Sequence, residues 1–290
     1  MNAIIRHPDS RLDRIKPALA CPACRGELSF EPDRALCAAC DEAYPIRGGK
    51  VYFVQVPERT DQLDKLKGFC KRLLGRYYHS IGINLIAPVY PFGYARRVRR
   101  HLDPARQLVL NLGCGTHRID ENMIGVDLFD YDAVDVVCDL RALPFKSESI
   151  DAMVSVSVLE HVPDPRVVVA ECDRCTKRGG IGMHLLPFLY PFHASPFDFH
   201  RFTHQGQQVL LDGWETVEQT NAAGPVTLML ICLIEFLSIV LSLGHEKLKA
   251  FINLLLCGLL FPVKFLDFPF INRKAFLTLA PTIFIVGRKP

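Results

Sequence analysis

Two glycines and a carboxylate stand where short apolar strands are expected to end. The apolar run at residues 107–112 leads into the turn Gly113-Cys-Gly115, and the run Ile124-Gly-Val leads into Asp127. Glycines in such a turn let backbone N–H groups approach a ligand that a β-carbon would exclude. A carboxylate at the tip of the neighbouring strand can accept hydrogen bonds from both hydroxyls of a ribose. The pattern indicates a nucleoside site.

A dinucleotide-binding turn would have a third glycine where this chain has Arg118. Three further blocks follow in order: DLRALPF from Asp139, residues 149–162 ending in Leu-Glu-His-Val, and residues 174–180 ending in Gly-Gly. In this order and spacing the blocks resemble the class I S-adenosylmethionine-dependent methyltransferases, specifically the type 11 group, over about residues 107–220. The resemblance implies an α/β fold with a Rossmann-like, mostly parallel sheet.

The resemblance also assigns roles around the cofactor S-adenosylmethionine. Leu112, Gly113 and Gly115 would line its methionine portion, Asp127 would bind the ribose, Asp139 and Leu140 would contact the adenine, and Ser155 would lie beneath the sulfonium. The chain departs from the family pattern at Asn111, where an acidic residue is usual, and at His117, where a third glycine is usual. Because of these departures, a methyltransferase-like scaffold without catalytic activity stays an alternative.

The connection between the first two expected strands is short. Eleven residues separate Gly115 from Asp127, whereas a crossover through a helix takes about a dozen or more. We expect that helix to be shortened or absent, which would leave the methionine end of the cofactor open.

A loop rich in proline and aromatic residues, residues 187–203, follows the fifth expected strand; we call it the acceptor loop. Open α/β sheets bind ligands beyond the carboxyl ends of their strands, so this loop is expected to face the methyl acceptor. Asp198, His200 and Arg201 are the candidate acceptor-binding residues. The alternative is that Asp198 and Arg201 pair with each other and brace the loop.

Two histidines are candidate catalytic bases: His161 in the Leu-Glu-His-Val block and His193 in the acceptor loop. Methyl transfer is an in-line displacement in which alignment supplies much of the rate, so a base is needed only where the nucleophile must lose its proton. Histidine suits that task because its pKa lies near neutral pH. For His161 a capping role is the alternative.

Four cysteines near the N-terminus have the spacing of a metal site. Cys21 and Cys24 form one Cys-x-x-Cys turn, and Cys37 and Cys40 form a second. Two such turns complete a tetrahedron of thiolates suited to structural zinc, whose binding can supply folding free energy on the order of 10 kcal/mol. The block resembles the zinc-ribbon family that partners and activates methyltransferases, here fused to its enzyme. A third pair, Cys172 and Cys175, falls on a helical pattern and is assigned to the core.

The chain therefore divides into a zinc ribbon at residues 1–56, a helical connector at 57–105 and a methyltransferase domain at 106–290. Within the connector, apolar residues at helical spacing predict a helix over 61–76, and four arginines cluster within 94–102. A solvated helix face, anionic lipid or RNA phosphate would each account for the charges. RNA is disfavoured because no aromatic residues interleave with them and the net charge is only +3.

An apolar helical insertion, residues 225–270, lies between the last two expected strands and so inside the last β-hairpin. Its first run, 226–243, is marginal for crossing a bilayer, and its second, 250–262, is too short, since a span takes about 20 residues. If both flanking strands join one sheet, the insertion must begin and end on the same side of any membrane. Peripheral membrane contact through 226–262, a homodimer interface and added core all satisfy this constraint. Lys264 near its end would suit anionic headgroups.

The predicted function is S-adenosylmethionine-dependent methyl transfer to a small-molecule acceptor, either lipid-linked or a glycan, at the cytosolic face of a membrane. The N-terminus has no apolar stretch of signal-peptide length, so we expect a cytoplasmic protein, peripheral on the inner face of the cell membrane. The second enzyme hypothesis is an RNA or protein methyltransferase that docks its substrate on the zinc ribbon.

Overall fold

The computed structural model describes residues 11–57, 75–77, 81–82, 85–88, 94–193 and 197–290. The helix expected over residues 61–76 lies outside these residues except for its last two positions. Those two positions begin the short 3₁₀ helix η2 (Gly75–Tyr77).

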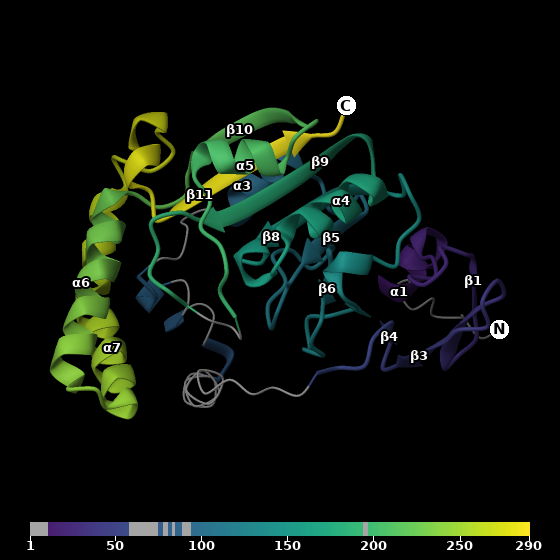
Figure 1. Ribbon diagram of the computed structural model, residues 1–290, viewed down its shortest axis with the longest axis horizontal. Coiled ribbons are helices and arrows are strands. Elements are labelled where there is room, and N and C mark those ends of the chain that lie inside the picture. The colour runs from purple at the N-terminus through teal and green to yellow at the C-terminus, as the bar shows by residue number, and fades with distance from the viewer. Residues whose placement is uncertain (1–10, 58–74, 78–80, 83–84, 89–93, 194–196) are drawn as a thin grey trace, which may run out of the picture.

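One sheet of 11 strands runs through the molecule, in the order β1-β2-β3-β4-β7-β6-β5-β8-β9-β11-β10 (Figure 1). Its centre is parallel and consists of β7 (Val136–Val137), β6 (Ile124–Asp127), β5 (Val109–Leu112), β8 (Ile150–Val156) and β9 (Thr176–Pro187). The last hairpin is antiparallel, with β11 (Thr282–Arg288) between β9 and β10 (Glu215–Asn221). The parallel centre confirms the predicted Rossmann-like α/β fold.

Helices cover both faces of the central strands. Successive side chains of a strand point to opposite faces, so the apolar side chains of these strands need a core on each side. On β5, Val109 joins the core beneath α3 (Tyr94–His101), whereas Leu110 joins the core that includes α4 (Pro165–Cys175). The helix α5 (His204–Leu210) lies on the α4 side (Figure 1). Cys172 and Cys175 are buried in the α4 core, which confirms their assignment.

The ribbon extends this sheet. Its strands β1 (Leu28–Phe30), β2 (Arg34–Cys37) and β3 (Ala43–Arg47) are antiparallel, and β4 (Lys50–Tyr52) pairs with β3 on one side and, in parallel, with β7 on the other. Ahead of the ribbon, α1 (Arg11–Ile15) and the 3₁₀ helix η1 (Lys16–Ala18) bury apolar side chains in the same core as β5 and α4. The boundary at residue 56 stays a prediction, but ribbon and central sheet share one hydrophobic core.

Residues 113–123, between β5 and β6, are all described and contain no helix, as expected from the short connection. A buried ion pair fixes the connection instead. Arg118 donates hydrogen bonds to the carbonyl oxygen of Ala133 (2.6 Å) and to the carboxylate of Asp135 (2.9 Å). Asp135 in turn accepts one from the N–H of Gly125 on β6 (2.8 Å). Charge-assisted bonds of this kind are the stronger ones in proteins, so the connection is held without helix packing.

The apolar insertion forms a helical hairpin that stands away from the sheet (Figure 1). Its helices α6 (Pro225–Ser242) and α7 (Glu246–Leu260) pack against each other, and the 3₁₀ helix η6 (Phe261–Asp267) continues α7. The prediction that the second run is too short to cross a membrane is wrong, since Glu246–Asp267 is helical over 22 residues. A proline is tolerated in the first turn of a helix, so Pro262 does not end the helical segment.

Two buried charged side chains anchor the base of the hairpin. The Lys264 side chain donates to the carbonyl oxygen of Ala87 (2.7 Å), and burial lowers the pKa of Lys264 to about 8. The expectation that Lys264 meets lipid headgroups is therefore wrong. Asp267 accepts hydrogen bonds from three N–H groups at the start of α6, those of Gly224 (3.0 Å), Val226 (2.8 Å) and Thr227 (2.8 Å). A last 3₁₀ helix, η7 (Lys274–Leu279), leads into β11.

We expect Asp267→Ala to lower the free energy of unfolding by about 2 kcal/mol, because the N–H groups at the start of α6 lose their acceptor. Thermal unfolding followed by circular dichroism measures the change. The matched control is Asp212→Ala, at an exposed position outside the hairpin, which should leave Tm unchanged. Equal Tm values for the two variants would show that this carboxylate does not anchor α6.

Candidate active site

The Gly-x-Gly turn lies at the carboxyl end of β5 with the geometry of a ligand cradle. Gly113 and Gly115 have φ of 59° and 56°, a region that favours glycine. A β-carbon on Gly113 would come within 2.5 Å of Val158, so packing also demands glycine there. A β-carbon on Gly115 would meet no described atom within 4 Å. The Gly115 side of the turn therefore faces open space.

Two carboxylates end the neighbouring strands. Asp127, at the end of β6, accepts hydrogen bonds from the N–H groups of Gly115 (2.8 Å) and Phe129 (3.0 Å). Asp139 follows β7, and its carboxylate pairs with the Arg141 guanidinium (2.6 Å). Burial alone would raise the pKa of Asp139, but the hydrogen bonds from Arg141 outweigh it and lower the pKa. Asp139 directly follows Cys138, whose N–H donates to the carbonyl oxygen of Asp127 (2.9 Å), so the two aspartates stand at adjacent strand ends. Carboxylates at this edge suit a cationic sulfonium ligand.

The other predicted cofactor residues are buried at or behind this edge. Leu112 and Ser155 are fully buried, and Leu140, at the start of the 3₁₀ helix η4 (Leu140–Ala142), is nearly so. The Ser155 hydroxyl hydrogen bonds with Nδ1 of His184 on β9 (2.8 Å). Burial lowers the pKa of His184 to about 4. The glycine turn and Asp127 thus come together at the ends of β5 and β6, whereas Asp139 follows the adjacent strand β7. The roles of all seven residues stay predictions.

The acceptor loop is braced from within. Pro187 ends β9, and the other described residues of the loop, 188–193 and 197–203, contain no helix or strand, as expected. All three guanidinium nitrogens of Arg201 donate, to both carboxylate oxygens of Asp198 and to three backbone carbonyl groups of the loop. Burial alone would raise the pKa of Asp198, but hydrogen bonds from Arg201 and from the His193 N–H lower it to about 2. The structure therefore contains the pairing alternative, and contact of either residue with an acceptor stays a prediction.

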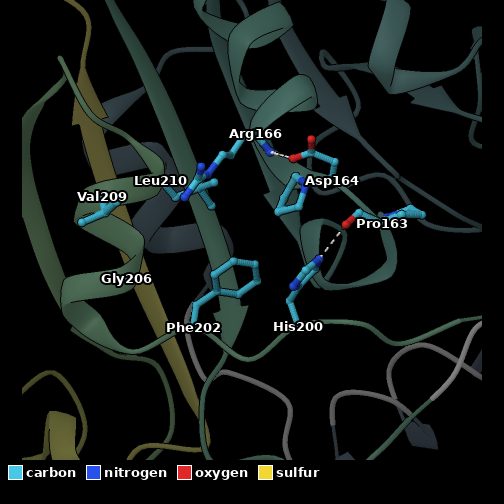
Figure 2. A pocket seen from close by; sticks show the side chains of 9 residues that line it. Pro163, Asp164, Arg166, His200, Phe202, Gly206, Val209 and Leu210 are labelled. Atoms are coloured by element: carbon cyan, nitrogen blue, oxygen red, sulfur yellow. Dashed lines mark hydrogen bonds between the residues drawn. The ribbon is translucent and has the colours of Figure 1, made fainter.

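His200 lines a separate cavity of about 380 Å³ between the start of α4 and α5 (Figure 2). Its Nε2 donates to the carbonyl oxygen of Pro163 (3.0 Å). The lining residues are Pro163, Asp164, Pro165, Arg166, His200, Phe202, Gly206, Val209 and Leu210. No predicted cofactor residue is among them, so this cavity is not part of the glycine cradle.

Both candidate bases face one buried glutamate. Glu160 and His161 lie on the 3₁₀ helix η5 (Leu159–His161) after β8, and His193 approaches from the acceptor loop. The two imidazole rings are 5.2 Å apart between centroids. Glu160 directly precedes His161 in the sequence, yet it is absent from the predicted site residues. Glutamate is rarely fully buried, so the pattern alone gave no reason to select it.

The four ribbon cysteines come together as predicted. Their sulfur atoms all lie within 4.8 Å of one another, with Cys21 and Cys40 at 3.6 Å and Cys24 and Cys37 at 3.4 Å. A tetrahedral site with Zn–S bonds of about 2.3 Å would separate its sulfur atoms by about 3.8 Å. The donor set and its spacing therefore fit zinc.

Comparison with known proteins agrees with this geometry. A family profile described as "Methyltransferase domain" matches residues 110–183, which run from β5 into β9. The match therefore covers β5, β6, β7, β8 and the first part of β9, and it is to a methyltransferase domain. No curated protein matches the chain.

Solved structures resemble the chain at low sequence identity. The S-adenosylmethionine complex of Haemonchus contortus phosphoethanolamine N-methyltransferase 2 is 16% identical, with 86% of this chain and 62% of that chain covered and a TM-score of 0.50. A Thermotoga maritima S-adenosylmethionine-dependent methyltransferase is 15% identical, with coverages of 79% and 100% and a TM-score of 0.45. A chain from a complex of the Haloferax volcanii Trm112 methyltransferase activator is 17% identical, with coverages of 80% and 100% and a TM-score of 0.43. At such identities the similarity speaks for the fold alone.

We expect Gly115→Ala to weaken S-adenosylmethionine binding by at least about 10-fold, equivalent to about 1.4 kcal/mol. The added methyl group would enter the open side of the turn, while strain at positive φ would cost only about 1–2 kcal/mol of stability. Calorimetric titration measures the binding. Gly113→Ala, whose methyl group would collide with Val158, should instead destabilise the fold. Unchanged affinity in Gly115→Ala would show that the turn does not hold the cofactor.

The buried pair of Ser155 and His184 predicts a pH dependence. The pKa of folded His184 is about 4, below the unfolded value of about 6.5, so folding favours the neutral ring. Its contribution to stability is complete above about pH 6.5 and is lost as the pH falls toward 4, by roughly 3 kcal/mol. Denaturant unfolding between these pH values should show a shallower dependence in His184→Gln. The same pH dependence of unfolding free energy in the natural protein and in His184→Gln would refute this role of His184.

Proposed function

We propose that this protein transfers a methyl group from S-adenosylmethionine to a lipid-linked acceptor, such as a lipid-linked glycan, at the surface of a membrane. The observation that carries the proposal is an exposed apolar hairpin beside the acceptor loop. The methyltransferase domain supports the reaction class, and the hairpin supports the place and the acceptor.

Both helices of the hairpin present apolar stripes to solvent. Large apolar side chains recur at helical spacing on α6 (Met229, Leu233, Phe236, Val240) and on α7 (Phe251, Leu255, Leu259), and all are exposed. Only 33% of the apolar stretch of α6 is buried, and only 11% of the apolar stretch within Glu246–Asp267 is buried. A core helix of a soluble protein would be mostly buried, whereas large exposed apolar patches mark protein or membrane interaction sites. We favour lipid as the partner of these stripes.

Tyr190 of the acceptor loop lies close enough to the hairpin for the charges of the hairpin to act on it. Burial raises the pKa of Tyr190 in that loop to about 12, and the nearby Cys257 on α7 and Glu235 on α6 act in the same direction. An acceptor anchored in the membrane by its lipid would therefore approach the loop from the hairpin side.

The charges of the hairpin favour a position in the plane of the membrane surface. Glu235, near the middle of α6, pairs with Lys249 of α7 (2.7 Å). In a spanning helix this pair would lie deep in the hydrocarbon, where charges are costly. In an interfacial hairpin, polar groups stay at headgroup level while apolar side chains enter the leaflet. Exposed Arg273 and Lys274 at the base would meet anionic headgroups.

S-adenosylmethionine would supply an electrophilic methyl group, and zinc bound by the ribbon would stabilise the fold. We assign Gly113 and Gly115 to the methionine portion, Asp127 to the ribose and Asp139 to the adenine. The negative charge of the two carboxylates would favour the cationic cofactor over its neutral product. His161 or His193 would accept a proton from acceptors that must lose one.

Vesicle binding tests the hairpin. The double variant Phe236→Ser/Phe251→Ser should bind vesicles of phosphatidylcholine and phosphatidylglycerol at least about 10-fold more weakly, because each buried phenylalanine is worth about 1.5–3 kcal/mol. Both side chains are more than 60% exposed (61% and 63%), so the fold should be unaffected. Val209→Ser, an equally exposed apolar position on α5 (66%), is the matched control. Equal co-sedimentation of the natural protein, the double variant and Val209→Ser would contradict membrane docking.

The acceptor is tested with tritiated S-adenosylmethionine and fractionated lipids, glycans, RNA and proteins from the source cells. Incorporation into the lipid fraction, lost in Gly115→Ala, is the expected result. Label in the RNA or protein fraction alone would replace the proposed acceptor.

A further inference from the structure

The cluster of Glu160, His161 and His193 has the geometry of a second metal site, separate from the ribbon. The Glu160 Oε1 atom lies 3.6 Å from Nε2 of His193 and 3.9 Å from Nε2 of His161. One candidate ligand atom from each of the three residues lies within 4.8 Å of the others. The histidines are partly exposed, with side chains 17% and 30% accessible, so solvent reaches the cluster.

Glu160 is the unusual member. Its side chain is fully buried, and neither carboxylate oxygen has a hydrogen-bond partner in the described part of the chain. Arg201 could neutralise it, but the Arg201 guanidinium is already committed to Asp198 and to three loop carbonyl groups. A buried carboxylate without hydrogen bonds is costly unless a cation compensates it.

Both histidines are oriented as metal ligands are. Nδ1 of His161 donates to the carbonyl oxygen of Phe197. Nδ1 of His193 lies 3.2 Å from the carbonyl oxygen of Pro191 and 3.3 Å from the carboxylate of Asp198. Arg201 Nη2 also lies 3.5 Å from Nδ1 of His193, but it donates over shorter distances to Asp198 (2.7 Å) and to the Pro191 carbonyl oxygen (2.9 Å). With a proton on each Nδ1, the lone pair of each Nε2 is directed to the side of Glu160. Metal-ligating histidines almost always donate their other N–H to a carboxylate or carbonyl in this way.

We propose that Glu160, His161 and His193 bind a divalent transition-metal cation of the zinc class. Two imidazole nitrogens and one carboxylate oxygen suit zinc, whereas magnesium and calcium prefer oxygen ligands alone. Zinc bonds of about 2.0–2.1 Å would separate tetrahedral ligands by about 3.3–3.5 Å, so the 3.6 and 3.9 Å separations need only small side-chain adjustments.

Three protein ligands leave a fourth position open, the arrangement of zinc sites that bind a substrate or water. The position lies at the carboxyl ends of β8 and β9, next to the acceptor loop. An oxygen or nitrogen atom of the methyl acceptor would take that position, where the cation would lower the pKa of the acceptor and so replace the base role proposed above for His161 or His193. This last assignment rests on the proposed function, whereas metal binding itself does not.

Metal content separates this site from the ribbon. The full-length protein, dialysed against zinc and then freed of loosely bound metal, should contain two zinc ions per chain by mass spectrometry. Glu160→Gln and His193→Gln should each contain one and bind the second at least about 100-fold more weakly. His200→Gln, in the same loop but outside the cluster, is the matched control and should keep two.

Cobalt spectroscopy identifies which site is lost. The first equivalent of Co²⁺ should show the thiolate-to-metal charge transfer of the ribbon, and the second equivalent should add a spectrum without it. Circular dichroism confirms that each variant is folded, and two different ligand variants guard against the failure of one.

One metal ion per chain in the natural protein, with no second equivalent bound, would overturn the proposal. Two ions retained in both ligand variants would overturn it equally. Because neither measurement uses methyl transfer, a second metal in a protein without methyltransferase activity would refute only the proposed function.

Discussion

The hydrogen bond from the Gly115 N–H to the Asp127 carboxylate joins the two strand ends on which the candidate cofactor site depends. β5 and β6 pair in parallel, with Leu112 opposite Val126, so the glycine turn and the carboxylate leave the sheet side by side. In larger α/β crossovers a helix holds such strand ends in register. Here the buried pair of Arg118 and Asp135 does so. Charge and hydrogen bonding therefore hold the glycine turn and Asp127 in place. The connection between β5 and β6 needs no helix for this purpose.

Two buried carboxylates beside His193, those of Asp198 and Glu160, differ in their hydrogen bonding. Asp198 receives the Arg201 guanidinium and a backbone N–H. Glu160 receives neither, although its carboxylate is equally buried. The first pattern fixes a loop, and the second leaves negative charge available to a cation. One ion pair therefore braces the acceptor loop, and a buried carboxylate without a hydrogen bond in the described part of the chain lies next to it.

Local sequence patterns predicted what depends on local chemistry. Apolar runs ending in glycine or aspartate predicted β5 and β6, cysteine spacing predicted the cluster of four thiols, and the helical pattern around Cys172 and Cys175 predicted α4. What they missed depends on partners distant in the chain. The burial of Glu160, the pairing of Arg118 with Asp135 and the burial of Lys264 against Ala87 all require the folded arrangement. Charged residues read as solvent-facing in a sequence, so these were the positions most open to error.

The pairing of β4 with β7 gives the ribbon a role beyond its metal. It covers a side of the central sheet that would otherwise present unpaired N–H and C=O groups of β7. Exposed strand edges of this kind are templates for pairing between molecules. Loss of a metal held by the four cysteines would therefore loosen more than the ribbon, because it would also uncover an aggregation-prone edge of the central sheet.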